Sequence, residues 1–145
     1  MKIAIGSDHA GYNLKEYIKK FLINNKITYK DFGTYSADPV DYPDIARPLA
    51  KAIKYKKYDF GILICGSGIG MSMAANKVRR ARAAVCTSAY TAKMSREHNN
   101  ANILCLGSRT TPRKLAMQII KIFLSTKFKK GRHLRRINKI EPLWY

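Results

Sequence analysis

Residues 59–75, DFGILICGSGIGMSMAA, contain the pattern that decides the fold of this chain. The apolar run at 62–64 has no alternating polar residue, which is typical of a strand buried on both faces of a parallel sheet. Cys65 ends this run, and alternating glycines follow it at Gly66, Gly68 and Gly70. The glycines predict a tight turn, and residues 71–77 predict the first turns of a helix. We therefore expect a strand, a glycine-rich turn and a helix in direct succession.

This arrangement is suited to binding an anion. The N–H groups of the turn point outward, and the dipole at the helix N-terminus adds to their positive potential. Cys65 lies at the rim of the turn, where that potential favours the reactive thiolate. The alternative is that Cys65 is a small buried side chain that closes a strand. Nucleotide binding is poorly supported, because the dinucleotide pattern G-x-G-x-x-G needs glycine where Met71 stands, and the P-loop spacing is absent.

Length and composition limit the class of protein. The 145 residues correspond to one domain, spanning 1–145, with 28 Lys and Arg against 9 Asp and Glu and a formal charge of +19. A field of this size attracts anions from sugar phosphates to nucleic acids. The three cysteines form neither a disulfide framework nor a metal-binding spacing. With no long apolar run and no signal-peptide pattern, we expect a cytoplasmic protein that does not bind membranes.

Strand and helix patterns alternate along the whole chain. Strands are expected at 2–6, 27–32, before Cys65, at 81–86 and at 103–106, and helices at 12–24, from Asp44 to 53, at 71–77, 88–97 and 111–124. This order predicts an α/β fold: a doubly wound, Rossmann-like, five-stranded parallel sheet with helices on both faces. Residues 33–43 are expected to form a long polar loop. Residues 127–145 are expected to form a basic C-terminal arm or short helix that reaches away from the core.

In such sheets a ligand binds beyond the carboxyl ends of the strands. Asp8 and His9 follow the first expected strand, Cys65 the third, and Arg109 the fifth. Each has a plain structural explanation when taken alone: Asp8 as a turn residue, His9 as a surface histidine and Arg109 as a solvated charge. Their common position at strand ends predicts a binding site.

The chain resembles ribose-5-phosphate isomerase B, in the family that also contains the galactose-6-phosphate isomerase subunits. The resemblance covers essentially the whole chain and rests on these motifs: GSDHAG at 6–11, DYP at 41–43, CGSGIG at 65–70, AANK at 74–77, HNNAN at 98–102, GSR at 107–109 and GRH at 131–133. It departs from the common pattern at Ser67, where the family often has threonine. Some relatives use a glutamate base further along the turn, but this region holds Met71, Ser72 and Met73.

The resemblance implies interconversion of D-ribose 5-phosphate and D-ribulose 5-phosphate, a step of the pentose phosphate pathway, without a metal or other cofactor. It implies that Cys65 is the base that moves a proton between C1 and C2, and that His98 opens the sugar ring. The enediolate would be held by Ser67 and by the amides of Gly66, Gly68, Ile69 and Gly70. The remaining implied contacts are Asp8 and Tyr42 to sugar hydroxyls, Asn99 to the sugar or enediolate, and His9, Arg109, Arg132 and Arg136 to the phosphate.

The resemblance also implies a homodimer, or a dimer of dimers, whose active sites are shared, so that Arg132 and Arg136 serve a neighbouring subunit. Two other functions stay open. The first is isomerisation of a 6-phosphohexose such as allose or galactose 6-phosphate. The second is nucleic-acid binding through residues 127–139, which would depend steeply on salt. The second is less well supported because few aromatic residues accompany the arginines there.

Overall fold

Within residues 1–140, five strands run parallel in one sheet, in the order β2-β1-β3-β5-β4. The computed structural model describes residues 1–140. The strands are β1 (Lys2–Ser7), β2 (Thr28–Asp31), β3 (Phe60–Cys65), β4 (Ala83–Val85) and β5 (Ile103–Gly107). The helices are α1 (Tyr12–Asn24), α2 (Tyr42–Lys54), α3 (Ile69–Asn76), α4 (Ala89–Glu97), α5 (Arg113–Ser125) and α6 (Arg132–Ile140). The predicted α/β, Rossmann-like fold is therefore confirmed.

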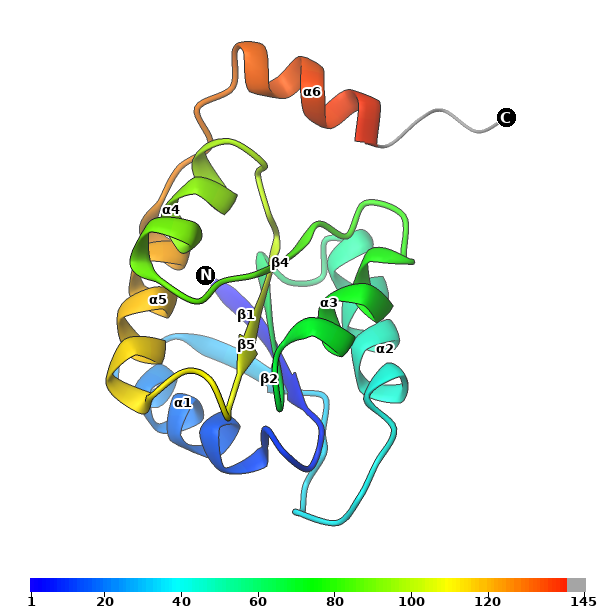
Figure 1. The fold of residues 1–145 in the computed structure, drawn as a ribbon, viewed down its shortest axis with the longest axis vertical. Coiled ribbons are helices and arrows are strands. Elements are labelled where there is room, and N and C mark those ends of the chain that lie inside the picture. The colour runs from blue at the N-terminus through cyan, green and yellow to red at the C-terminus, as the bar shows by residue number, and fades with distance from the viewer. Residues whose placement is uncertain (141–145) are drawn as a thin grey trace.

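Helices cover both faces of the sheet (Figure 1). Because side chains alternate along a strand, one face of the central strands packs against α1, α4 and α5, and the other against α2 and α3. On β3, Ile62 and Ile64 belong to the first layer, while Leu63 and Cys65 belong to the second. The uninterrupted apolar run of β3 is thus explained by burial on both sides. Among residues 1–140, no helix is long and apolar enough to cross a membrane.

Two helices begin earlier than the sequence pattern predicts. Asp44 was the predicted helix start, but α2 begins at Tyr42, after Asp41 in an extended conformation. Pro43 stands in the first turn, where a proline loses no hydrogen bond and its fixed φ favours the helix. Helix α3 likewise begins at Ile69 rather than at 71, which places Gly70 inside the helix.

The C-terminal segment contains a short basic helix, one of the two forms predicted for it, and this helix contacts the rest of the protein through two buried residues. Two residues of α6, His133 and Ile137, one helical turn apart, are buried, while its other residues are exposed. Lys129, just before this helix, donates its backbone N–H to the carbonyl of Glu97 at 3.0 Å. Figure 1 shows α6 beyond the amino ends of the strands, at the end of the molecule opposite the loops that follow β1 and β5. Residues 141–145 of the predicted arm lie outside the described residues.

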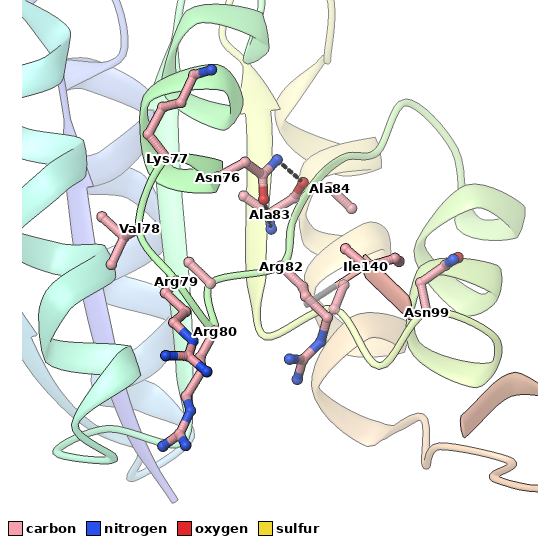
Figure 2. A pocket seen from close by; sticks show the side chains of 12 residues that line it. Asn76, Lys77, Val78, Arg79, Arg80, Arg82, Ala83, Ala84, Asn99 and Ile140 are labelled. Carbon is pink, nitrogen blue, oxygen red and sulfur yellow. Dashed lines mark hydrogen bonds between the residues drawn. The ribbon is translucent and has the colours of Figure 1, made fainter. Parts of the chain in front are cut away.

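The outer edge of β4 is covered by a side chain. Asn76, at the end of α3, donates from Nδ2 to the carbonyl of Ala83 at 2.9 Å and accepts from the N–H of Ala83 at 2.8 Å (Figure 2). The amide thereby makes the two hydrogen bonds that a neighbouring strand would make. β4 is shorter than the predicted strand, and Asn76 satisfies its exposed edge.

Candidate active site

Cys65 and the glycine turn form the centre of the site. The side chain of Cys65 is 5% exposed, and its Sγ accepts a hydrogen bond from the N–H of Gly68 at 3.1 Å. Gly68 has a φ of +81°, which a residue with a side chain rarely adopts, and it turns the chain directly into α3. The Oγ of Ser67 accepts from the N–H of Ile69 at 3.3 Å. The predicted strand, turn and helix are therefore present, with the sulfur bonded to an amide of the turn.

Hydrogen bonds between loops bring three strand ends together. The N–H of Ser108 donates to the carbonyl of Cys65 at 2.8 Å, and the N–H of Arg109 donates to the carbonyl of Gly66 at 3.0 Å. The hydroxyl of Ser108 donates to the carbonyl of Ala10 at 2.8 Å. The Arg109 guanidinium lies beside Gly66, since a Cβ on that glycine would be 3.4 Å from Nη1. The loops after β1, β3 and β5 thus form one surface, with Arg109 beside the glycine turn.

Asp8 and His9 both support neighbouring loops. Asp8 is buried, and its Oδ1 accepts from the N–H of Gly11 at 2.9 Å, which is the turn role considered for it from sequence. His9 Nδ1 accepts from the N–H of Val40 at 3.2 Å. A neutral His9 that accepts at Nδ1 carries its proton on Nε2. The loop at 33–41 is therefore fixed to the loop that follows β1.

Tyr42 packs against the glycine turn. A Cβ on Gly70 would lie 3.0 Å from the Cζ atom of the Tyr42 ring, so a side chain at this position would push the ring outward by a few tenths of an ångström. Because Tyr42 begins α2, this contact brings the end of the 33–41 loop to the start of α3. Tyr42 is 40% exposed and can contact a ligand.

A cavity next to Arg109 contains residues that the sequence analysis did not single out. It has a volume of about 390 Å³ and lies between the starts of α1 and α5. Asn13 and Arg113 line it together with Arg109 and Ser108. The sequence could have indicated Asn13 and Arg113, because each stands in the first turn of a helix that follows a strand. Anions bind at such helix N-termini.

Four predicted site residues lie at the other end of the sheet: His98, Asn99, Arg132 and Arg136. Helix α4 leaves the carboxyl end of β4 and returns to the amino end of β5, so His98 follows it at the amino edge. The loop at 98–102 contacts the start of β3, where the N–H of Gly61 donates to the carbonyl of Asn102 at 2.9 Å. From Gly61 to Cys65 the strand rises about 13 Å, at about 3.3 Å per residue. One chain alone therefore does not bring His98 to Cys65.

At this amino edge, the start of α6 contacts the end of α4. The imidazole rings of His98 and His133 are stacked, with centroids 4.2 Å apart and an interplanar angle of 8°. Lys129 Nζ lies 2.9 Å from Glu97 Oε2. The hydrogen bond from Lys129 lowers the pKa of Glu97, so this carboxylate stays charged at neutral pH. Stacking and ion pairing together link the start of α6 to the end of α4.

Arg96 and Arg82 hold the loop at 98–102. Arg96 is buried, with its guanidinium 4.6 Å from the ring centroid of Phe60, and its Nη1 donates to the carbonyl of Ala101 at 2.5 Å. Arg82 Nε donates to the carbonyl of Asn100 at 2.9 Å. Asn99 lies between these anchored residues and lines a cavity of about 540 Å³ beside β4 (Figure 2). Within residues 1–140, no group of three or more His, Cys, Asp or Glu side chains could hold a metal ion.

A parallel α/β sheet with a glycine turn, a thiol and an arginine at its carboxyl edge places the protein in the Rossmann-like class, whose ligands bind at that edge. Residues 3–140 match the family model described as Ribose/Galactose Isomerase. The chain belongs to this family, and it is an isomerase.

Similar proteins agree with this assignment. Ribose-5-phosphate isomerase B of Escherichia coli is 42% identical over 142 residues, which cover 98% of this chain and 95% of that protein. A structure of ribose-5-phosphate isomerase B from Clostridium thermocellum is 52% identical, with a TM-score of 0.96 and coverage of 97% of this chain and 95% of the other. A structure of the Mycoplasma genitalium enzyme with bound ribulose 5-phosphate is 45% identical, with a TM-score of 0.91 and coverage of 96% and 93%.

Proposed function

We propose that this isomerase interconverts D-ribose 5-phosphate and D-ribulose 5-phosphate through an enediolate, with Cys65 as the base. The observation that carries the proposal is the Cys65 sulfur, which lies within the glycine turn at the carboxyl edge and accepts an amide N–H at 3.1 Å, in a chain of this family. The names of the similar ribose-5-phosphate isomerases support this substrate. Family membership also favours an isomerase over the nucleic-acid-binding alternative.

The proton transfer needs a base and a set of donors for the developing oxyanion. The Cys65 thiolate removes the proton from C2 of the open-chain aldose, and electron density moves to the carbonyl oxygen at C1. Return of the proton to C1, with transfer of a hydroxyl proton from O2 to O1, gives the ketose. The Gly68 N–H stabilises negative charge on the sulfur, which leaves the amides of Gly66 and Gly70 and the Ser67 hydroxyl for the substrate oxygens.

The substrate phosphate is bound by hydrogen-bond donors from both ends of the sheet. Arg109 and His9 stand at the carboxyl edge near the glycine turn, whereas Arg132 and Arg136 stand on an exposed face of α6. Guanidinium groups bind phosphate well because they present several fixed donors. All four can act on one phosphate only if a second subunit supplies the pair from α6.

The active site is therefore shared between two subunits of a homodimer. In this arrangement Cys65 and Arg109 come from one subunit, and His98, Asn99, Arg132 and Arg136 come from the other. The separation of His98 from Cys65 within one chain supports this arrangement. Exposed apolar side chains on α3 and α4, namely Ile69, Met73 and Tyr90, provide a surface for a second copy.

A coupled assay with ribose 5-phosphate tests the role of Cys65. Cys65→Ala is expected to fold normally and to lose nearly all turnover, because the base is absent. Cys86→Ala is the matched control, since Cys86 is equally buried but lies at the end of β4, away from the turn. Near-native turnover by Cys65→Ala would remove Cys65 from the mechanism. Running 6-phosphohexoses in the same assay tests the alternative substrates.

Mixing two inactive variants tests whether the site is shared. Cys65→Ala and His98→Asn subunits are unfolded together and refolded, so that mixed dimers form. A mixed dimer has one site with both substitutions and one site with neither. About a quarter of wild-type activity is expected, because half of randomly formed dimers are mixed and each has one intact site. Absence of recovered activity, with mixed dimers shown by mass spectrometry, would contradict the shared site.

A further inference from the structure

The stacked pair of His98 and His133 has a geometry that constrains the chemistry of His98. His98 is the C-cap of α4, and its N–H donates to the carbonyl of Met94 at 2.9 Å. His133 lies in the first turn of α6, with 8% of its surface exposed. The ring planes differ by only 8° at a centroid distance of 4.2 Å. The His133 ring therefore covers one face of the His98 ring and limits its rotation.

The surroundings of the pair favour the neutral form of His133. Burial and the nearby charges of His98, Arg132 and Arg136 lower the pKa of His133. Lys129 adds a further positive charge, and its partner Glu97 is the acid of this cluster, with Lys93 at 3.9 Å on its other oxygen. The stacked ring of His133 is therefore kept neutral at neutral pH.

Helix α6 has a buried face that packs on the protein and an exposed face that carries arginines. His133 and Ile137 are buried and pack toward the protein, whereas Arg132 and Arg136 are exposed on a neighbouring face. Because residues four apart lie on the same face of a helix, the packing face and the phosphate-binding face are adjacent. His133 is therefore placed to act on His98 and not on a phosphate.

We propose that His133 is a positioning residue, and that its stacked ring holds the His98 ring in the orientation that ring opening requires. This inference rests on the proposed function, in which His98 opens the furanose ring. It predicts that loss of His133 affects ring opening and spares the proton transfer at Cys65.

Two variants and two readouts test the inference. His133→Ala removes the stack, His133→Phe keeps a flat ring that cannot be protonated, and Arg135→Ala is the control on the exposed face of α6. The first readout is conversion of ribose 5-phosphate. The second is exchange of solvent deuterium into C1 of ribulose 5-phosphate, followed by NMR. Exchange needs only the base, because ribulose 5-phosphate is an open chain.

His133→Ala is expected to slow conversion of ribose 5-phosphate at least about tenfold, since a mispositioned acid loses much of its effect. Its rate of deuterium exchange should stay within about twofold of the wild-type rate, because the base is untouched. His133→Phe should restore most of the conversion, and Arg135→Ala should leave both rates unchanged.

Equal losses of conversion and exchange in His133→Ala would overturn the inference, as would a His133→Phe variant no more active than His133→Ala. His98→Asn in the same assays separates this failure from failure of the proposed function. Suppose that His98→Asn loses conversion but keeps exchange, whereas His133→Ala loses both to the same extent. In that case only the inference about His133 fails. If His98→Asn also loses both rates equally, the ring-opening role of His98 fails.

Discussion

Replacing Lys15 by methionine should destabilise the protein strongly. Lys15 is completely buried, and its Nζ donates to both oxygens of Asp31, at 2.7 and 2.8 Å, and to the carbonyl of Thr34 at 2.5 Å. Methionine has a similar length but no charge and no donor. The substitution therefore removes three hydrogen bonds with little change in volume, and it leaves an acceptor at Thr34 without its donor.

The contacts that Asp31 keeps in Lys15→Met determine how much unfolding free energy is lost. Asp31 keeps Lys19 at 2.9 Å and the N–H of Gly33 at 2.9 Å, so its charge is not left unpaired. Removing one partner of a buried ion pair costs about 3–5 kcal/mol, and the two remaining contacts place Lys15→Met near the lower end, at about 3 kcal/mol. For a chain of this size such a loss lowers Tm by about 6–12 °C.

The pH dependence provides an independent test. Burial alone would raise the pKa of Asp31, but hydrogen bonds from Lys15, Lys19 and the Gly33 N–H outweigh burial and lower it. A lowered carboxyl pKa stabilises the fold above the unfolded value of about 3.9, and this stability is lost as pH falls through the folded value. Between pH 5 and 3, Lys15→Met should therefore lose less stability than the wild type.

Urea unfolding followed by circular dichroism measures both effects at matched protein concentration. Lys20→Met is the control, because Lys20 is an exposed lysine on the same helix, and its stability should be unchanged. A loss below about 1 kcal/mol at pH 7, typical of a surface ion pair, would refute the argument. So would a pH dependence between 5 and 3 identical to that of the wild type.

Three further predictions use the same unfolding measurement. Gly11→Ala should lower the free energy of unfolding by about 1–3 kcal/mol, because the new Cβ would lie 2.6 Å from the carbonyl oxygen of Ile64. An unchanged stability would contradict this and show that the loop can move away. Phe123→Ala should cost about 3–5 kcal/mol, because the fully buried ring packs edge to face on Phe60 at 5.7 Å; a loss below about 1 kcal/mol would contradict this. Because the pKa of His133 is lowered in the folded protein, the unfolded chain binds a proton at this histidine more readily. Stability should therefore fall as pH drops below about 6.5, and His133→Phe should weaken that pH dependence.

The fold could be predicted from sequence because its strongest signals are local. An apolar run that ends in Cys65 and alternating glycines specifies a buried strand, a tight turn and a helix without reference to the rest of the chain. Helix starts were harder to place. Pro43 suggested that the loop continued to residue 43, whereas a proline in the first turn of α2 is favourable.

The site could be predicted only in part, because its members are brought together by tertiary structure. Strand ends correctly placed Asp8, Cys65 and Arg109 at one edge of the sheet, since parallel strands share a carboxyl edge. Neither the separation of His98 from Cys65 nor the stacking of His133 on His98 has a local signal. Both depend on where α4 ends and where α6 packs, which the chain's periodicity does not encode.

The Asn76 amide on the edge of β4 has a consequence for behaviour in concentrated solution. A strand from another molecule cannot extend the sheet at Ala83 without first displacing both hydrogen bonds of that amide. Sheet extension of this kind is the first step toward fibrils. Asn76 therefore protects the edge of β4 from pairing with a strand of another molecule. With this protection, β4 needs no acidic or proline residue to prevent aggregation.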